Sequence, residues 1–133
     1  MATRVAGALA VLGGVAWLVK FALIWENGGT NTTDGLVGVL FDIGAIGILL
    51  AAMVAAWYAP TRGPLRHRPV ALLAAVLAVA AAVNLPIGIG WLLFGRTWLA
   101  EEVGVLLTAV AAIVLGTRWV TAGAVRSAVD RTS

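Results

Sequence analysis

Long uncharged stretches divide this sequence into four apolar segments joined by short polar connectors. The segments cover residues 5–25, 35–59, 69–94 and 98–119, and few charged residues fall inside them. At 1.5 Å of rise per residue, about 20 apolar residues in a helix cross a hydrocarbon core of about 30 Å. The pattern therefore predicts four transmembrane helices. The connectors are too short for anything but antiparallel neighbours, so the expected fold is an all-α, up-down-up-down four-helix bundle.

The bundle is expected to form a single domain over residues 1–120. The remaining residues, 121–133, are small and polar, and they are expected to form a short cytoplasmic tail that frays. The composition agrees with a membrane protein: 62% of residues are hydrophobic and only 11% are charged, whereas soluble domains carry about 25% charged residues. The mean hydropathy is +1.02. A water-soluble domain of this length cannot bury so much apolar surface.

The orientation of the four segments follows from the basic residues. Seven arginines fall on one side of the predicted bundle, whereas only Lys20 and Arg96 approach the other. The seven are Arg4, Arg62, Arg66, Arg68, Arg118, Arg126 and Arg131. Because basic residues are enriched in cytoplasmic loops, both termini and the middle connector are expected to be cytoplasmic. The usage of Ala, Val and Arg is typical of a prokaryotic protein, and the expected location is the plasma membrane.

The same composition limits the chemistry. The chain has no cysteine, which excludes disulfides, thiolate metal sites and iron–sulfur clusters. Its one histidine, His67, lies in a basic connector, so two-histidine haem ligation within the chain is excluded as well. No cofactor, metal site or catalytic residue is predicted. No basic stripe indicates nucleic acid, so the expected partners are the lipid bilayer and either further copies of the chain or a larger membrane complex.

Small residues recur at four-residue spacing in the predicted helices. The rows are Gly104, Thr108, Ala112 and Gly116; Gly47, Ala51 and Ala55; and Ala6, Ala10 and Gly14. Such rows let membrane helices approach closely, although a chain this rich in alanine also produces them by chance. Together they predict a tightly packed bundle.

Four polar residues lie inside the apolar segments and form the candidate site. They are Lys20, Asp42, Asn84 and Glu101, at depths of about 5 to 15 Å from the outer ends of their helices. Each ionisable group shares a helix face with small residues, and an ionisable group in hydrocarbon costs about 2.5 to 3.5 kcal/mol on insertion scales. We expect them to form a polar cluster in the outer half of the bundle.

Each of these residues also has a purely structural interpretation. Lys20 is close enough to the surface to snorkel, and a Lys20–Asp42 ion pair could simply hold the bundle together. Glu101 and Glu102 suit a helix N-terminus that Thr97 caps. Asn84 could hydrogen-bond a neighbouring helix.

Proline and aromatic residues add two further expectations. Pro86, followed by Gly88 and Gly90, predicts a kink in the third helix at the depth of the polar cluster. Trp25, Trp91 and Trp98 are expected to form an outer aromatic girdle, with Trp57, Tyr58 and Trp119 as its inner counterpart. Trp17, in mid-helix, is assigned to packing.

Three classes of function remain open. The first is an accessory or assembly subunit, in which the polar cluster is structural, and this class requires the fewest assumptions. The second is an oligomeric transporter or channel for a small solute or cation, with an outward vestibule at Asp42 and Glu101. The third is a membrane-embedded enzyme, which the sequence favours least because no nucleophile–base pair, metal triad or phosphate loop is present.

Overall fold

A computed structural model describes residues 2–28, 35–59 and 63–132 of the chain. Its four long helices are α1 (Ala2–Glu26), α2 (Leu36–Tyr58), α3 (Arg68–Phe94) and α4 (Trp98–Thr132), with a short 3-10 turn, η1 (Gly63–Arg66), before α3. All four are long and apolar enough to cross a membrane, and in α4 this stretch is Trp98–Ala122. The predicted set of four apolar helices is confirmed.

Local sequence explains where several helices begin and end. The backbone N–H of Ala100 donates a hydrogen bond of 3.2 Å to Thr97 Oγ1, so Thr97 caps α4 as predicted. Pro69 occupies the first turn of α3, where a missing N–H costs nothing. Gly95 has a φ of 77°, a conformation that favours glycine and allows the tight turn from α3 to α4.

The last helix is longer than the hydropathy pattern predicts. Residues 121–132, expected to fray, continue α4 to Thr132. This segment contains no proline, and alanine and arginine, which recur in it, are strong helix formers. Hydropathy marks the end of the apolar stretch, not the end of the helix.

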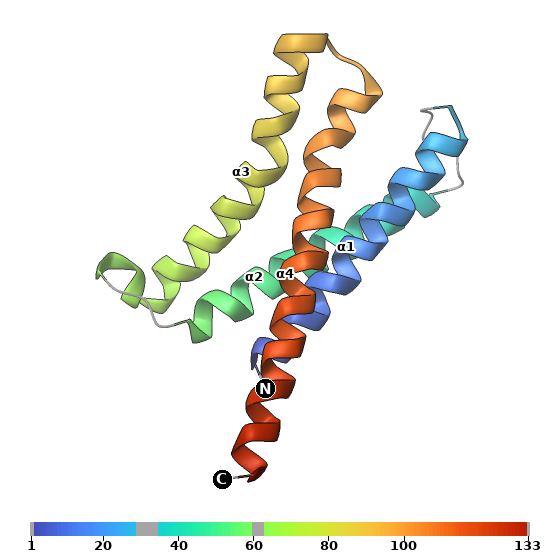
Figure 1. Cartoon of the computed structure of the whole chain (residues 1–133). Helices are drawn as coiled ribbons and strands as arrows, with labels where there is room; N and C mark the ends of the chain where they lie inside the picture. The colour runs from blue at the N-terminus through green and yellow to red at the C-terminus, as the bar shows by residue number, and fades with distance from the viewer. Residues whose placement is uncertain (1, 29–34, 60–62, 133) are drawn as a thin grey trace.

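Figure 1 shows that helices adjacent in the sequence run antiparallel, and that α1 begins at the end of the molecule where α4 stops. Helix α1 packs against both α2 and α4, whereas α3 packs against α2 and α4. Within the most apolar stretch of each helix, 44% of α1 but only 6% of α3 is buried. Helix α1 is therefore the centre of the bundle and α3 its peripheral member.

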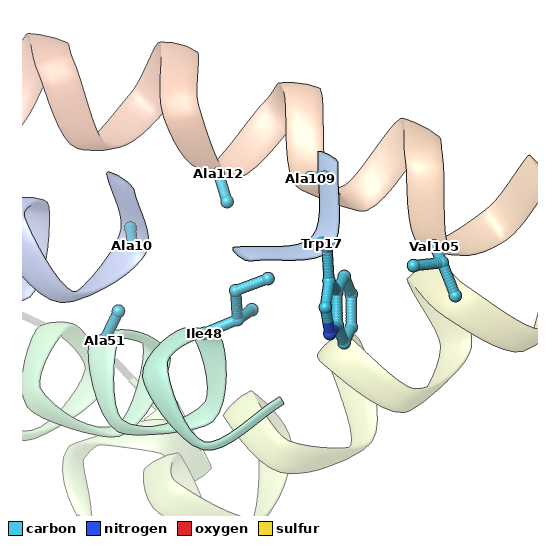
Figure 2. Packing of buried hydrophobic residues seen from close by; sticks show 7 residues of the cluster. All are labelled: Ala10, Trp17, Ile48, Ala51, Val105, Ala109 and Ala112. Atoms are coloured by element: carbon cyan, nitrogen blue, oxygen red, sulfur yellow. The ribbon is translucent and has the colours of Figure 1, made fainter. Parts of the chain in front are cut away.

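The core is built from small side chains around one large aromatic residue. Trp17 lies among Ala10, Ile48, Ala51, Val105, Ala109 and Ala112, contributed by α1, α2 and α4 (Figure 2). Close approach of backbones takes the place of large interlocking side chains. This arrangement is the one expected where van der Waals packing holds helices together.

Glycines mark close contacts between helices. A Cβ atom added at Gly7 of α1 would lie 2.6 Å from the carbonyl oxygen of Gly116 in α4. One added at Gly13 would lie 2.8 Å from the carbonyl oxygen of Gly44 in α2. The predicted rows in α1 and α4 are buried throughout, and in the α2 row only Ala55 is partly exposed. The prediction of a tightly packed bundle is confirmed for α1, α2 and α4.

Helix α3 is continuous from Arg68 to Phe94 with Pro86 inside it, and its ribbon curves along its length (Figure 1). Of the two glycines that follow the proline, Gly90 packs on Ala100 of α4, while a Cβ at Gly88 would meet no atom within 4 Å. Only Gly90 therefore contributes to helix packing.

Candidate functional site

A buried ion pair joins the first and last helices. The Nζ atom of Lys20 lies 2.8 Å from Oε1 and 2.7 Å from Oε2 of Glu102, so both carboxylate oxygens accept from the ammonium group. Lys20 is only 5% exposed, and the side chain of Glu102 is 13% exposed. Lys20 therefore does not snorkel to the surface but is neutralised inside the protein.

Glu102, expected only to suit the N-terminus of its helix, is the partner of Lys20, and among the described residues Lys20 forms no ion pair with Asp42. Glu102 shares a helix face with Val105, Ala109 and Ala112, at spacings of three, seven and ten residues, and all three are buried. Glu101 lies on a different face and is exposed. The sequence carried no signal that separates the two carboxylates, because Glu101 stands three and seven residues before Gly104 and Thr108, which are buried as well.

Two aromatic residues support the lysine. Phe41 of α2 presents its ring 5.4 Å from Lys20 Nζ, a cation–π contact. Trp17 stacks on Phe41, with ring centroids 5.7 Å apart, and its Nε1 donates a 2.9 Å hydrogen bond to the backbone oxygen of Phe41. The indole lies directly on Gly44, where a Cβ atom would collide with it. Trp17 is thus a packing residue that also positions Phe41.

Asp42 follows Phe41 in α2 and is exposed. Together with Lys20, Gly35, Val37, Gly38 and Phe41 it lines a hollow of about 420 Å³, which we call the Asp42 hollow. In the part of the chain that the structure describes, Asp42 has no ion-pair partner. Since Lys20 and Glu102 cancel each other, Asp42 leaves the group with one net negative charge.

The other two predicted site residues lie elsewhere. Asn84 is exposed and donates a 2.7 Å hydrogen bond to the carbonyl oxygen of Ala80 within α3, which satisfies the amide locally. Glu101 is exposed and does not line the Asp42 hollow. The structure therefore brings together Lys20 and Asp42 of the four predicted residues, and it adds Glu102 and Phe41.

Aromatic residues gather at both ends of the bundle. Near the α1–α2 and α3–α4 connections, Trp25 and Trp98 meet edge to face at 5.8 Å, and Phe21 lies beside both. In the same region the guanidinium of Arg96 lies 4.6 Å from the Trp91 ring. At the opposite end, Tyr58 and Trp119 line a pocket with the start of α1.

Among the described residues, no three His, Cys, Asp or Glu side chains lie together in a way that could hold a metal ion. The chain matches no known protein-family model, no curated protein and no solved structure. The interpretation of function therefore depends on the charges at this site: the Lys20–Glu102 ion pair, and beside it the Asp42 carboxylate, which forms no ion pair with the described residues.

Proposed function

We propose that this chain is a multi-pass membrane protein that acts as an accessory or assembly subunit of a membrane complex. The observation that carries the proposal is Asp42, an exposed carboxylate in an apolar helix, with no ion-pair partner among the residues that the structure describes. In this proposal Lys20 and Glu102 are structural, and Asp42 faces the partner.

The physical argument concerns the depth of Asp42. It follows the first residue of α2, Leu36, by six positions, which places it about 9 Å along the helix axis. A carboxylate at that depth is costly against lipid, and its short side chain reaches the interface poorly. Lys20, which lines the same hollow, is engaged with both oxygens of Glu102. A lysine or arginine on a helix of a neighbouring subunit would offset the charge.

The proposal includes an orientation, with both termini and the α2–α3 connection in the cytoplasm of a prokaryotic cell. Support comes from the arginines and from Figure 1, in which the start of α1 and the stop of α4 share one end of the molecule. Arg62, one of the seven, lies outside the described residues. Fusion of a periplasm-active or cytoplasm-active reporter to each terminus tests this orientation directly.

The assembly is tested by size measurement after gentle extraction from native membranes. The wild-type protein should elute with a partner as a complex larger than the free chain in its detergent micelle. Asp42→Asn removes the charge while keeping the shape, and it should release the chain from the complex. Glu26→Gln, at an exposed carboxylate on the last residue of α1, is the matched control and should leave the complex intact. An unchanged complex in Asp42→Asn, or a wild-type protein that is always free, would overturn the proposal.

One observation favours a second function. The Asp42 hollow, at about 420 Å³, is large enough to admit a small cationic solute to the unpaired carboxylate, as in a transporter or channel protomer. Purified protein in proteoliposomes distinguishes the two functions. Uptake of a cation or amine that Asp42→Asn abolishes, with no change in oligomeric size, supports transport and contradicts the accessory role.

A further inference from the structure

Helix α3 contacts α4 closely in one region and leaves a space in another. Gly104 of α4 packs on the backbone of Val83, and Gly90 of α3 packs on Ala100 of α4. Towards the start of α3 the two ribbons diverge (Figure 1). A hollow of about 280 Å³, here called the α3 cavity, lies in this region. Residues of all four helices line it, and it is open to the surface where Ala78 and Ala82 of α3 are exposed.

The wall of the α3 cavity is largely apolar, and two of its residues carry hydrogen-bonding side chains, Thr108 with a hydroxyl and Trp119 with an indole N–H. Ala78 and Ala82 of α3 and Ala111 and Leu115 of α4 are typical of its lining, to which Thr108 of α4 also contributes. Thr108 is only 9% exposed. Its Oγ1 atom is buried and has no hydrogen-bond partner among the described residues.

An unpaired buried hydroxyl is unfavourable, and a helical threonine normally avoids it by bonding the carbonyl one turn earlier. Thr108 does not form that bond. A rotation of about 120° about χ1 moves the hydroxyl to the position that the methyl group or the hydrogen held before. The residue can therefore present a single hydrogen-bond donor to a molecule that occupies the cavity.

We propose that the α3 cavity binds a small apolar molecule that carries one carbonyl oxygen, with the Thr108 hydroxyl donating to that oxygen. The size is suitable, since an apolar protein cavity of about 150 Å³ already accommodates benzene. The alanine wall provides the apolar contact. Of the two hydrogen-bonding groups in the lining, those of Thr108 and Trp119, the Thr108 hydroxyl is the one that is buried without a partner among the described residues. A carbonyl oxygen is the acceptor that we assign to it, as in a ketone, an ester or a related compound soluble in a bilayer.

The test compares two probes of matched shape, 4′-fluoroacetophenone and fluoro-α-methylstyrene, in which a methylene group replaces the carbonyl oxygen. Binding is followed by fluorine NMR at one fixed ratio of detergent to protein, so that partition into micelles is the same for every variant. The wild-type protein should bind the ketone more tightly than the hydrocarbon. Thr108→Val, which keeps the shape, should lower ketone affinity about fivefold, the equivalent of one neutral hydrogen bond, and leave the hydrocarbon unaffected.

Two further variants keep the result interpretable. Thr108→Ser retains the hydroxyl and should retain the preference for the ketone. Ala82→Leu places a larger side chain in the cavity and should abolish binding of both probes, with circular dichroism used to establish that the helices remain folded. Equal ketone affinity in the wild type and Thr108→Val, binding that survives Ala82→Leu, or no bound probe in the wild type would each overturn the proposal. None of these results depends on Asp42 or on assembly.

Discussion

The Lys20–Glu102 ion pair offers the sharpest test of the architecture, because it joins α1 to α4 across 82 positions of sequence. We expect Lys20→Met and Glu102→Leu each to destabilise the protein more than the double variant does. Each single variant leaves its partner charged, buried and unpaired. The double variant removes both charges at once.

The magnitude follows from burial. Lys20 is 5% exposed and the Glu102 side chain 13% exposed, so each single variant should lower the free energy of unfolding by about 3 to 5 kcal/mol. The double variant should lose less than either single one, because replacing a buried pair by apolar groups is often close to neutral. The coupling free energy between the two positions should therefore exceed about 2 kcal/mol. The cation–π contact with Phe41 is lost in Lys20→Met and in the double variant alike, so it does not contribute to the coupling free energy.

The assay is reversible unfolding in mixed micelles with increasing denaturing detergent, followed by far-ultraviolet circular dichroism. A second cycle, with Lys20→Met and Asp42→Asn, serves as the control, and its coupling should stay below about 1 kcal/mol since no ion pair joins these residues. Additive losses in the first cycle, with coupling below about 0.5 kcal/mol, would refute the pairing and the helix arrangement it requires.

Two further predictions use the same unfolding measurement. Gly7→Ala should lower the free energy of unfolding by about 1 to 3 kcal/mol, because its Cβ would lie 2.6 Å from the backbone oxygen of Gly116. The control, Gly38→Ala, lies in open space and should be neutral or stabilising by up to about 1 kcal/mol. Equal effects at the two sites would contradict the close packing of α1 on α4. Trp17→Phe should cost about 1 to 2 kcal/mol through the lost hydrogen bond to Phe41, and unchanged stability would show that this bond contributes nothing.

Much of the fold could be read from hydropathy and spacing. Apolar length determines the four helices, Thr97 identifies the start of α4, and the small-residue rows indicate which helix faces pack closely. These features are local, because each depends on residues within a few turns of one another. The depth of Lys20 and Asp42 is also a local property, since it requires only the rise per residue.

The partner of Lys20 was decided by the tertiary structure. Sequence spacing places Lys20, Asp42, Glu101 and Glu102 at the same end of the bundle, but it does not determine how each helix is rotated about its axis. Apolar residues surround these helices almost uniformly, so no strong amphipathic pattern indicates which face turns inward. Glu101 and Glu102 are separated by about 100° around the helix axis. Because of that angle, Glu101 is exposed and Glu102 forms the ion pair with the buried Lys20.

The α3 cavity has the same origin. The alanines of α3 and Thr108 of α4 can each be recognised as small-residue positions in the sequence, and either could have packed tightly, as Gly104 and Val83 do. Whether small residues produce contact or space depends on the direction that α3 takes relative to α4, and that direction is a property of the whole bundle. The amino-acid sequence by itself determined four apolar helices and the depth of their charges; the tertiary packing decided which charges meet and where a space remains.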